Sequence, residues 1–237
     1  MLIRPIPLLL VLCAATGLIF GLWPELDLWL SGAIRGEGGF HFDSGPLKAV
    51  RAVLYYLPAT AMGLVTLGWL AARFGLPLSK ALRPSGRSVL FLAFGLALGP
   101  GLLVNVGLKD HWHRPRPVQV SEFGGSAEFR PWYRLDGACQ KNCSFVSGEV
   151  AASAWLVAPA SLVPAPWRVQ AVAAALAVTA ATAVLRVAFG GHFSSDVIFA
   201  ALFTLLLVAG LRSLLLRPKE GEAEGSGEGL RPRDPHL

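Results

Sequence analysis

Charged residues are scarce in this chain of 237 residues: they make up 15% of it, whereas a soluble domain has about 25%. Hydrophobic residues make up 54%. This composition excludes an ordinary soluble enzyme and predicts a polytopic membrane protein. Cysteine is also rare, with three residues in all, and no Cys and His residues stand at the spacing of a zinc site.

Six apolar runs divide the chain, and each is expected to be a membrane-spanning helix. They cover residues 6–23, 49–74, 88–108, 150–163, 169–184 and 193–216. The first run is too long for a signal peptide, and no cleavage site of small residues follows it, so we expect it to stay in place. The predicted fold class is all-α: one six-helix membrane domain over residues 1–216, followed by a disordered cytoplasmic tail, 217–237.

Positive charges predict the orientation of these helices. The net charge of +6 does not indicate a nucleic-acid partner, because many of the cations lie in short connections and near the termini. The connection 75–87 carries three cations and no acid, which places it in the cytoplasm. Six spans put both termini on that same side. The long polar segment 109–147 and the short window 185–196 then share the opposite membrane face.

The window 185–196 holds an Arg, a His and an Asp at the edge of the membrane. Ionisable residues so close to hydrocarbon are costly, which suggests a function. His192 and Asp196 are spaced so that a carboxylate in the first turn of a helix can reach the imidazole. Arg186 can hold an anion beside them. On their own, the three residues fit equally well a loop His, a snorkelling Arg and an Asp that caps the last helix.

Two further stretches on the same face suggest a phosphate site. Lys109 and Arg116, together with Arg186, make three cations suited to clamping phosphate oxygens. Ser147 and Gly148 directly precede the fourth apolar run, and the free N–H groups at a helix N-terminus favour a bound anion. An ordinary helix N-cap is the alternative for Ser147.

An apolar patch and three arginines on this face are expected to serve no catalytic role. The apolar patch around Trp29, in the loop 24–46, predicts a short interfacial helix that anchors the loop. We prefer this to the alternative, a lid over a lipid site. Three more cations are expected on a solvated outer surface: Arg114, Arg130 and Arg134.

The three stretches together resemble the signature of the type-2 phosphatidic acid phosphatase superfamily. The first part is Lys-x6-Arg-Pro at residues 109–117, the second is Ser-Gly at 147–148, and the third is Arg-x5-His-x3-Asp at 186–196. Members of this family are membrane lipid phosphatases that share a catalytic core with vanadium haloperoxidases. The motifs cover residues 88–216, and the six-span layout matches the family's helical bundle. The apolar runs exclude a soluble haloperoxidase.

The resemblance implies phosphate hydrolysis without a metal or another cofactor. His192 would attack phosphorus and form a phosphohistidine, and Asp196 would hydrogen-bond the other ring nitrogen and stabilise the positive ring. Water would then release phosphate. The phosphoryl oxygens would be held by a set of five residues: Lys109, Arg116, Ser147, Gly148 and Arg186.

The sequence departs from the family pattern in three places, one of which, Pro115 and Pro117 on either side of Arg116, only stiffens the chain. Glu149 stands where the family has a His that protonates the leaving group, and a Glu can do this only in its protonated form. Burial and nearby phosphate would raise its pKa, while neighbouring arginines would lower it, so the sequence leaves the sign of the shift open. Leu185 stands where the family often has Ser, which removes one hydrogen bond to phosphate.

The segment from Cys139 to Glu149 also resembles, more loosely, a bacterial subgroup that includes lipid A phosphatases. Cys139 and Cys143 lie on the predicted periplasmic face, where disulfides persist, so we favour a disulfide over two free thiols. The expected location is the bacterial inner membrane, with the active site facing the periplasm.

The predicted function is hydrolysis of a phosphate monoester or pyrophosphate on a membrane lipid, with that lipid and the bilayer as partners and no nucleic acid. Two alternatives stay open: transfer of the phosphoryl group to another lipid at the same site, and a head-group-binding protein in which Glu149 marks lost chemistry. A transporter is disfavoured because the charges gather at one face. The candidate substrates are lipid A, phosphatidylglycerol phosphate, phosphatidic acid and undecaprenyl pyrophosphate.

Overall fold

Helices account for almost all the regular structure of the protein. The computed structural model describes residues 5–36, 38–41, 44–77 and 83–216. The long helices are α1 (Pro5–Leu22), α3 (Gly45–Arg73), α4 (Gly86–Leu96) with the π-helix η3 (Ala97–Leu108) that continues it, α7 (Ala165–Ala188) and α8 (Ser194–Leu215). The short ones are α2 (Glu25–Ile34), α5 (Gly148–Trp155), α6 (Val157–Ala160), and the 3-10 turns η4 (Pro117–Gln119) and η5 (Ser121–Phe123).

The described part of the chain contains no β-strand, which confirms the predicted all-α class. Among these described residues, five helices are long and apolar enough to cross a membrane, and they match five of the six predicted runs. A short helix predicted in the loop 24–46 is present as α2. The predicted tail, 217–237, lies outside the described residues.

The fourth predicted run, 150–163, does not form one long helix. It consists of α5 and α6, separated by a break at Leu156. Pro159 explains the break, because it has no N–H to donate to the carbonyl of Trp155 four residues earlier. The side chain of Trp155 is fully buried and instead donates from Nε1 to the carbonyl of Leu92, 3.0 Å away. This pair of short helices therefore lies inside the bundle, packed by α3, α4, α7 and α8.

The third predicted run is continuous but changes its winding at Ala97. After α4 the chain follows the wider π-helix η3, which contains Pro100. The wider turn continues to its end, where the N–H of Lys109 donates to the carbonyl of Val104. Such turns are frequent at functional sites. Here the winding sets the direction in which Lys109 leaves the helix.

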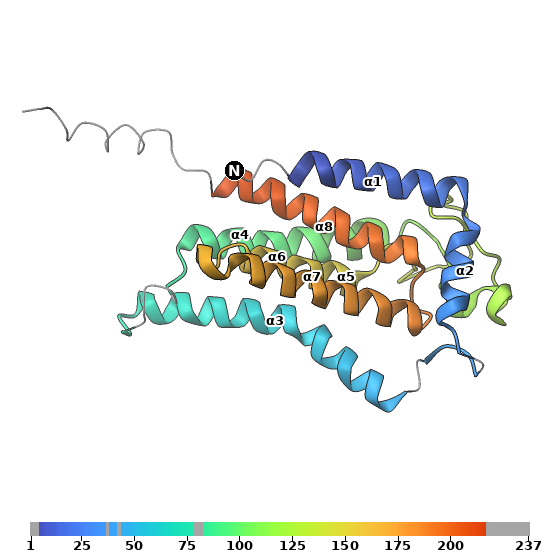
Figure 1. The fold of residues 1–237 in the computed structure, drawn as a ribbon, viewed down its shortest axis with the longest axis horizontal. Coiled ribbons are helices and arrows are strands. Elements are labelled where there is room, and N and C mark those ends of the chain that lie inside the picture. The colour runs from blue at the N-terminus through green and yellow to red at the C-terminus, as the bar shows by residue number, and fades with distance from the viewer. Residues whose placement is uncertain (1–4, 37, 42–43, 78–82, 217–237) are drawn as a thin grey trace, which may run out of the picture.

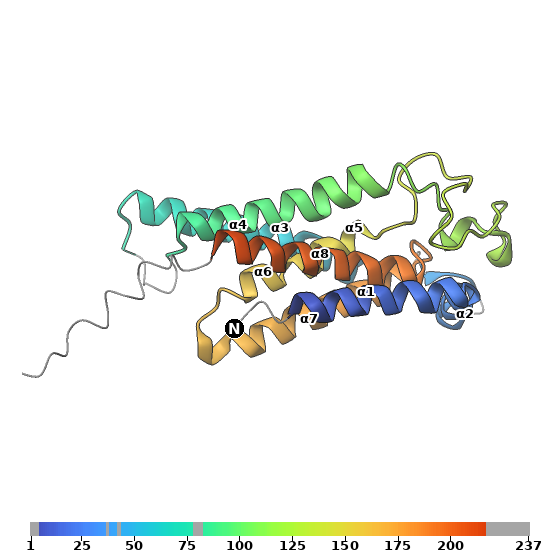
Figure 2. The same cartoon turned by 90° about the horizontal axis from the view of Figure 1, so that it is seen from above.

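The long helices run side by side along the longest axis of the molecule, and α2 crosses them at one end (Figure 1). The polar segment 109–147 gathers at this same end (Figure 2). The N-terminus of α8 and the C-terminus of α7 point there too, so the three motif-bearing stretches meet at one end of the bundle (Figures 1 and 2). A buried aromatic cluster around Phe145 and Phe199 packs beneath them.

Candidate active site

The loop between α7 and α8 holds His192 and the guanidinium of Arg186 next to each other. Gly190 has a positive φ of 62°, a conformation that suits glycine. A Cβ on Gly191 would lie 2.4 Å from Nη2 of Arg186, so the guanidinium packs directly on the glycine backbone. The two glycines of this window therefore let the arginine approach the residue before His192.

The imidazole of His192 is fixed in one tautomer. Only 2% of the residue is exposed, and Nδ1 lies 2.6 Å from the carbonyl oxygen of Ser144. Because a carbonyl only accepts, Nδ1 carries the proton and Nε2 keeps its lone pair. Burial, followed by the charges of Arg186, Lys109 and Arg116, holds the pKa of His192 well below its usual range. The ring is therefore neutral at pH 7, as a nucleophile must be.

Asp196 has different partners from those predicted. Its carboxylate accepts hydrogen bonds from Arg114 Nη1 at 2.5 Å, from the Ser144 hydroxyl at 2.5 Å and from the backbone N–H of Phe193 at 2.8 Å. The imidazole of His192 is bonded by the Ser144 carbonyl instead, so the expected direct bond from Asp196 is replaced by a bond through Ser144. Asp196 is thus linked to the ring indirectly, through Ser144.

Lys109 and Arg116 are held by the same residue, Asn142. Nζ of Lys109 donates to Oδ1 of Asn142 at 3.1 Å, and Nη2 of Arg116 donates to its carbonyl at 2.7 Å. Burial, together with the charges of Arg116 and Arg186, lowers the pKa of Lys109 to about 8. This mutual repulsion shows that the three cations share one small region, in which an anion would be strongly stabilised.

Ser147 and Gly148 start α5 beside this group of cations. The Ser147 hydroxyl caps the helix by accepting from the N–H of Val150 at 3.4 Å, which confirms the alternative named for Ser147, an ordinary helix N-cap. A Cβ on Gly148 would lie 3.3 Å from Nζ of Lys109 and 2.9 Å from Oδ1 of Asn105. The absence of a side chain at 148 therefore gives Lys109 its place at the helix N-terminus.

Glu149 forms ion pairs with two arginines. Its Oε1 lies 2.5 Å from Nη2 of Arg51 and 3.5 Å from Nη1 of Arg186, and its Oε2 accepts from Nε of Arg51 at 3.0 Å. Burial alone would raise its pKa, but the hydrogen bonds from Arg51 and the charges of Arg186, Arg51 and Lys109 outweigh burial and lower it. The direction of the pKa shift that the sequence left open is therefore downward, and Glu149 is a carboxylate.

Cys139 and Cys143 are joined by a disulfide, as favoured from the sequence. The backbone beside the bridge is tied to the first motif, because the N–H of Cys143 donates to the carbonyl of Lys109 and the N–H of Ser144 donates to that of Arg114. The disulfide therefore constrains the backbone directly before Ser144, the residue whose carbonyl contacts His192.

A family model described as the PAP2 superfamily, the type-2 phosphatidic acid phosphatases, matches residues 88–218, which is more than half of the chain. This chain belongs to the PAP2 superfamily. Its three signature motifs are the ones that the structure brings together around His192.

Relatives of this PAP2 protein include three lipid A 4'-phosphatases. The one from Francisella tularensis subsp. novicida (strain U112) is 32% identical over 89% of this chain and 96% of its own length. Those from Rhizobium leguminosarum and Rhizobium etli are 36% and 37% identical over 83% of this chain, and the match covers 90% and 81% of their lengths. No solved structure matches the chain. The predicted family and the predicted class of enzyme, a phosphatase, are confirmed.

The prediction that Arg114 lies on a solvated surface is wrong. This arginine of the PAP2 protein is completely buried and bridges two buried carboxylates: Nη1 donates to Asp196, and Nη2 donates to Asp27 at 2.8 Å. Asp27, from α2, also accepts from the backbone N–H of Ser195 at 2.8 Å. Among the other two arginines, Arg134 is exposed as predicted, and Arg130 is partly exposed.

Several residues of the site went unrecognised in the sequence: Ser144 and Asn142 in the long loop, and Asp27 and Arg51 farther away. The last two are the most distant. Each stands in a stretch predicted to serve the membrane, and each meets its partner across a large sequence separation, 168 residues for Asp27 and 98 for Arg51. One signal for Arg51 was present: with Lys48 it puts two cations at the end of a span that the charge pattern predicts to face the periplasm, where positive residues are disfavoured. Asp27 had no such signal beyond being acidic in an interfacial helix.

Proposed function

We propose that this PAP2 protein removes a phosphate monoester from lipid A at the periplasmic face of the inner membrane, through a phosphohistidine on His192. The observation that carries the proposal is the neutral imidazole beside three cations, with Nδ1 held by the Ser144 carbonyl. The three lipid A 4'-phosphatase relatives supply the substrate class.

In the first step, Nε2 of His192 attacks phosphorus, the bond from phosphorus to the lipid oxygen breaks, and that oxygen leaves as an alkoxide that takes a proton from solvent. The negative charge that builds up on the phosphoryl oxygens is stabilised by the site's donors: Lys109, Arg116, Ser147, Gly148 and Arg186. In the second step, water attacks phosphorus, the bond to nitrogen breaks and phosphate leaves. The cations supply the charge that a metal would otherwise provide.

The imidazole becomes positive as the bond to phosphorus forms, and the buried network around Asp196 stabilises that charge. Nδ1–H donates to the Ser144 carbonyl, and the Ser144 hydroxyl donates to Asp196. Arg114 and Asp27 hold Asp196 in place from the other side. Asp196, Arg114 and Asp27 are in this scheme positioning residues that act through Ser144.

Glu149 takes part as a carboxylate. In this form it cannot donate the proton that the family's His gives to the leaving group, but it can accept a proton from the attacking water. Its ion pairs with Arg51 and Arg186 keep it beside the cations that bind phosphate. We therefore assign Glu149 to the second step, as general base.

The proposed topology has six crossings. The pair α5 and α6 counts as the sixth, because it lies between the four helices that pack around it. An even number of crossings leaves both termini on the cytoplasmic side, with the cation-rich connection 75–87. The whole of residues 1–216 forms one domain, with its catalytic core at 88–216 and the tail beyond it.

The experiment is a panel of phosphorylated lipids assayed for released phosphate with purified protein in mixed micelles. We expect release from lipid A and none with the His192→Ala variant. Retained release by that variant would refute the mechanism, and phosphate found on an acceptor lipid instead of in water would show a phosphotransferase.

A further inference from the structure

The loop closed by the Cys139–Cys143 disulfide lies on the first motif and presents Asn142 to it. The N–H of Cys143 donates to the carbonyl of Lys109 at 3.2 Å. The N–H of Asn142 donates to the carboxylate of Asp110, also at 3.2 Å. The disulfide and these two hydrogen bonds therefore fix the backbone of Asn142 beside residues 109 and 110.

Asn142 accepts a hydrogen bond from each of two cations of the phosphate site, one with its side chain and one with its backbone. Nζ of Lys109 donates to its Oδ1 at 3.1 Å, and Nη2 of Arg116 donates to its carbonyl oxygen at 2.7 Å. The like charges of these two cations oppose each other. One shared residue holds them together. Because an ammonium has three donors and a guanidinium five, other donors remain for phosphate oxygens.

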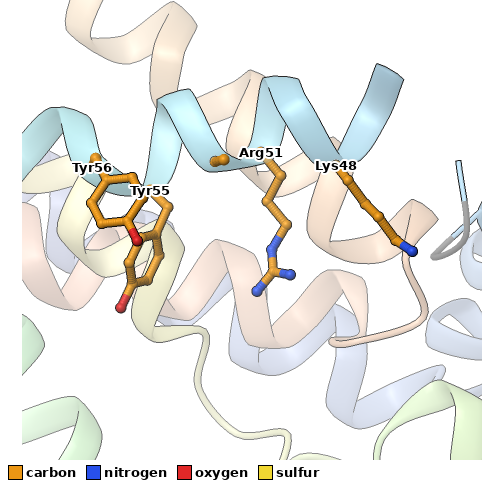
Figure 3. Close-up of a pocket in the computed structure, with 5 residues that line it drawn as sticks. Lys48, Arg51, Tyr55 and Tyr56 are labelled. Carbon is orange, nitrogen blue, oxygen red and sulfur yellow. The ribbon is translucent and has the colours of Figure 1, made fainter. Parts of the chain in front are cut away.

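The partner of these cations is neutral, in contrast to that of the neighbouring Arg51. The side chain of Arg51 extends from α3 (Figure 3), and its Nε donates to Oε2 of the Glu149 carboxylate at 3.0 Å. In the described part of the chain, no acid lies within ion-pair distance of Lys109 or Arg116. An acid would cancel part of the charge that binds phosphate, whereas an amide oxygen orients the two cations and leaves their charge intact.

The backbone at position 142 restricts which residue can hold these cations. Its φ is 53°, in the left-handed region that favours glycine and that Asn and Asp tolerate. Glycine has no side-chain acceptor for Lys109, and Asp would add a negative charge. Of these three residue types, Asn alone combines the backbone conformation with a neutral acceptor.

We propose that Asn142 is a positioning residue of the phosphate site, which holds Lys109 and Arg116 side by side without neutralising them. The inference rests on the proposed function, because it takes these two cations to bind the phosphate that is hydrolysed. Asn142 acts through the two cations and not by contact with the reacting atoms. The disulfide loop and the first motif thus form one phosphate-binding unit.

The titration of Lys109 gives this role a readout that a merely structural role would leave unchanged. Burial and the charges of Arg116 and Arg186 lower the pKa of Lys109 to about 8. The carboxylates of Glu149 and Asp110 act in the opposite direction. A change in the group to which Lys109 donates should therefore move the alkaline limb of the pH profile, where Lys109 loses its proton.

Replacing Asn142 by Asp keeps the left-handed backbone and the acceptor but adds a negative charge. In Asn142→Asp the new carboxylate raises the pKa of Lys109, so the ammonium persists to higher pH and the alkaline limb of kcat/KM should move up by about one pH unit. The same carboxylate cancels charge that binds phosphate, so kcat/KM at pH 7 should fall about tenfold. Steady-state rates from pH 5 to 10, with the lipid that the wild type hydrolyses, measure both.

Two further variants separate the acceptor from the backbone and from a general effect of charge. Asn142→Gly keeps the backbone bond to Arg116 and loses the bond to Lys109. Its kcat/KM should fall about fivefold, the worth of one hydrogen bond, and its alkaline limb should move down instead of up. Gln140→Glu is the matched control, because it adds the same charge at an exposed position of the same loop and should keep the wild-type rate and limb.

An alkaline limb and a kcat/KM value in Asn142→Asp that match the wild type would overturn the proposal, and so would equal changes in Gln140→Glu. Binding of inorganic phosphate to the detergent-solubilised protein, measured by calorimetry at pH 7, separates this from failure of the proposed function. If the wild type hydrolyses no lipid, the proposed function fails, and phosphate binding still decides the role of Asn142. Binding about tenfold weaker in Asn142→Asp supports that role. Equal binding, or no binding by the wild type, refutes it.

Discussion

Single residues in this site are set to the charge states that phosphoryl transfer requires. Burial and nearby cations lower the pKa of His192 and that of Lys109, with opposite consequences. In the proposed mechanism the neutral form of His192 is the nucleophile, so its lowered pKa favours the reaction. The charged form of Lys109, which is proposed to bind phosphate, persists only up to a pH of about 8. The same group of neighbouring cations therefore keeps His192 neutral and limits the pH range over which Lys109 is charged.

The alkaline limb of the pH profile should therefore report Lys109. Below a pH of about 8 Lys109 is charged, and above it the ammonium is lost, so kcat/KM should fall as pH rises through that value. In Lys109→Arg the cation persists to much higher pH, and the limb should move up by more than one pH unit. Steady-state rates from pH 5 to 10 check this, and an alkaline limb that stays in place in Lys109→Arg would contradict it.

Replacing Glu149 should affect the two chemical steps differently. If it is the general base of the second step, Glu149→Gln should slow breakdown of the phosphohistidine about 10²-fold or more and leave its formation almost unchanged. Phosphoenzyme should then accumulate, as seen by quenching a single turnover of labelled substrate. Slow formation with no accumulation would show that Glu149 acts on the leaving group instead. Glu149→Asp, which keeps the charge, is the control.

Among the elements, α2 in the N-terminal part of the chain is joined to α8 by buried ion pairs and hydrogen bonds. Asp27 from α2 bonds Arg114 and the first turn of α8, and the Ser195 hydroxyl donates to the same carboxylate at 2.5 Å. A buried ion set of this kind is costly to form and more costly to break. It fixes α2 across the end of the bundle, which a purely anchoring helix would not require.

Removing Arg114 should therefore unfold this end of the molecule. In Arg114→Met two buried carboxylates lose their shared cation, and we expect a loss of about 3–5 kcal/mol of stability, with kcat reduced through Ser144. Arg114→Lys keeps the charge and should recover part of both. Arg134→Met is the matched control, because Arg134 pairs on the exposed surface with Asp136 and should change little. Thermal unfolding in detergent measures it, and equal effects of the two Met variants would contradict the account.

Which elements could be predicted depended on how local their signals are. Long apolar runs and short motifs carry their own patterns, so five spans and the residues around Lys109, Ser147 and His192 were identified from the sequence. The break at Leu156 was missed because composition does not show where Pro159 would interrupt a helix. The burial of Arg114 was missed because an arginine in a polar loop looks solvated until its distant partner, Asp27, is known.

At the scale of the whole molecule, the account requires every motif to face the same side of the membrane. The structure gathers the three motifs at one end of the bundle, and the C-terminus of α3 and the N-terminus of α4 lie at the other (Figure 1). Reporter fusions test the orientation. A green fluorescent protein joined after residue 74 should fluoresce, and alkaline phosphatase joined there should be inactive. Alkaline phosphatase joined after residue 36 should be active. The reverse pattern would place the site in the cytoplasm.

In the proposed mechanism His192 carries the phosphoryl group. A rapid quench of the wild type with a lipid labelled in the scissile phosphate tests this directly. The account predicts label on His192 within the first turnover, labile in acid and stable in alkali, and none in His192→Ala. Release of labelled phosphate in the first turnover with no label on the protein at any quench time would contradict it.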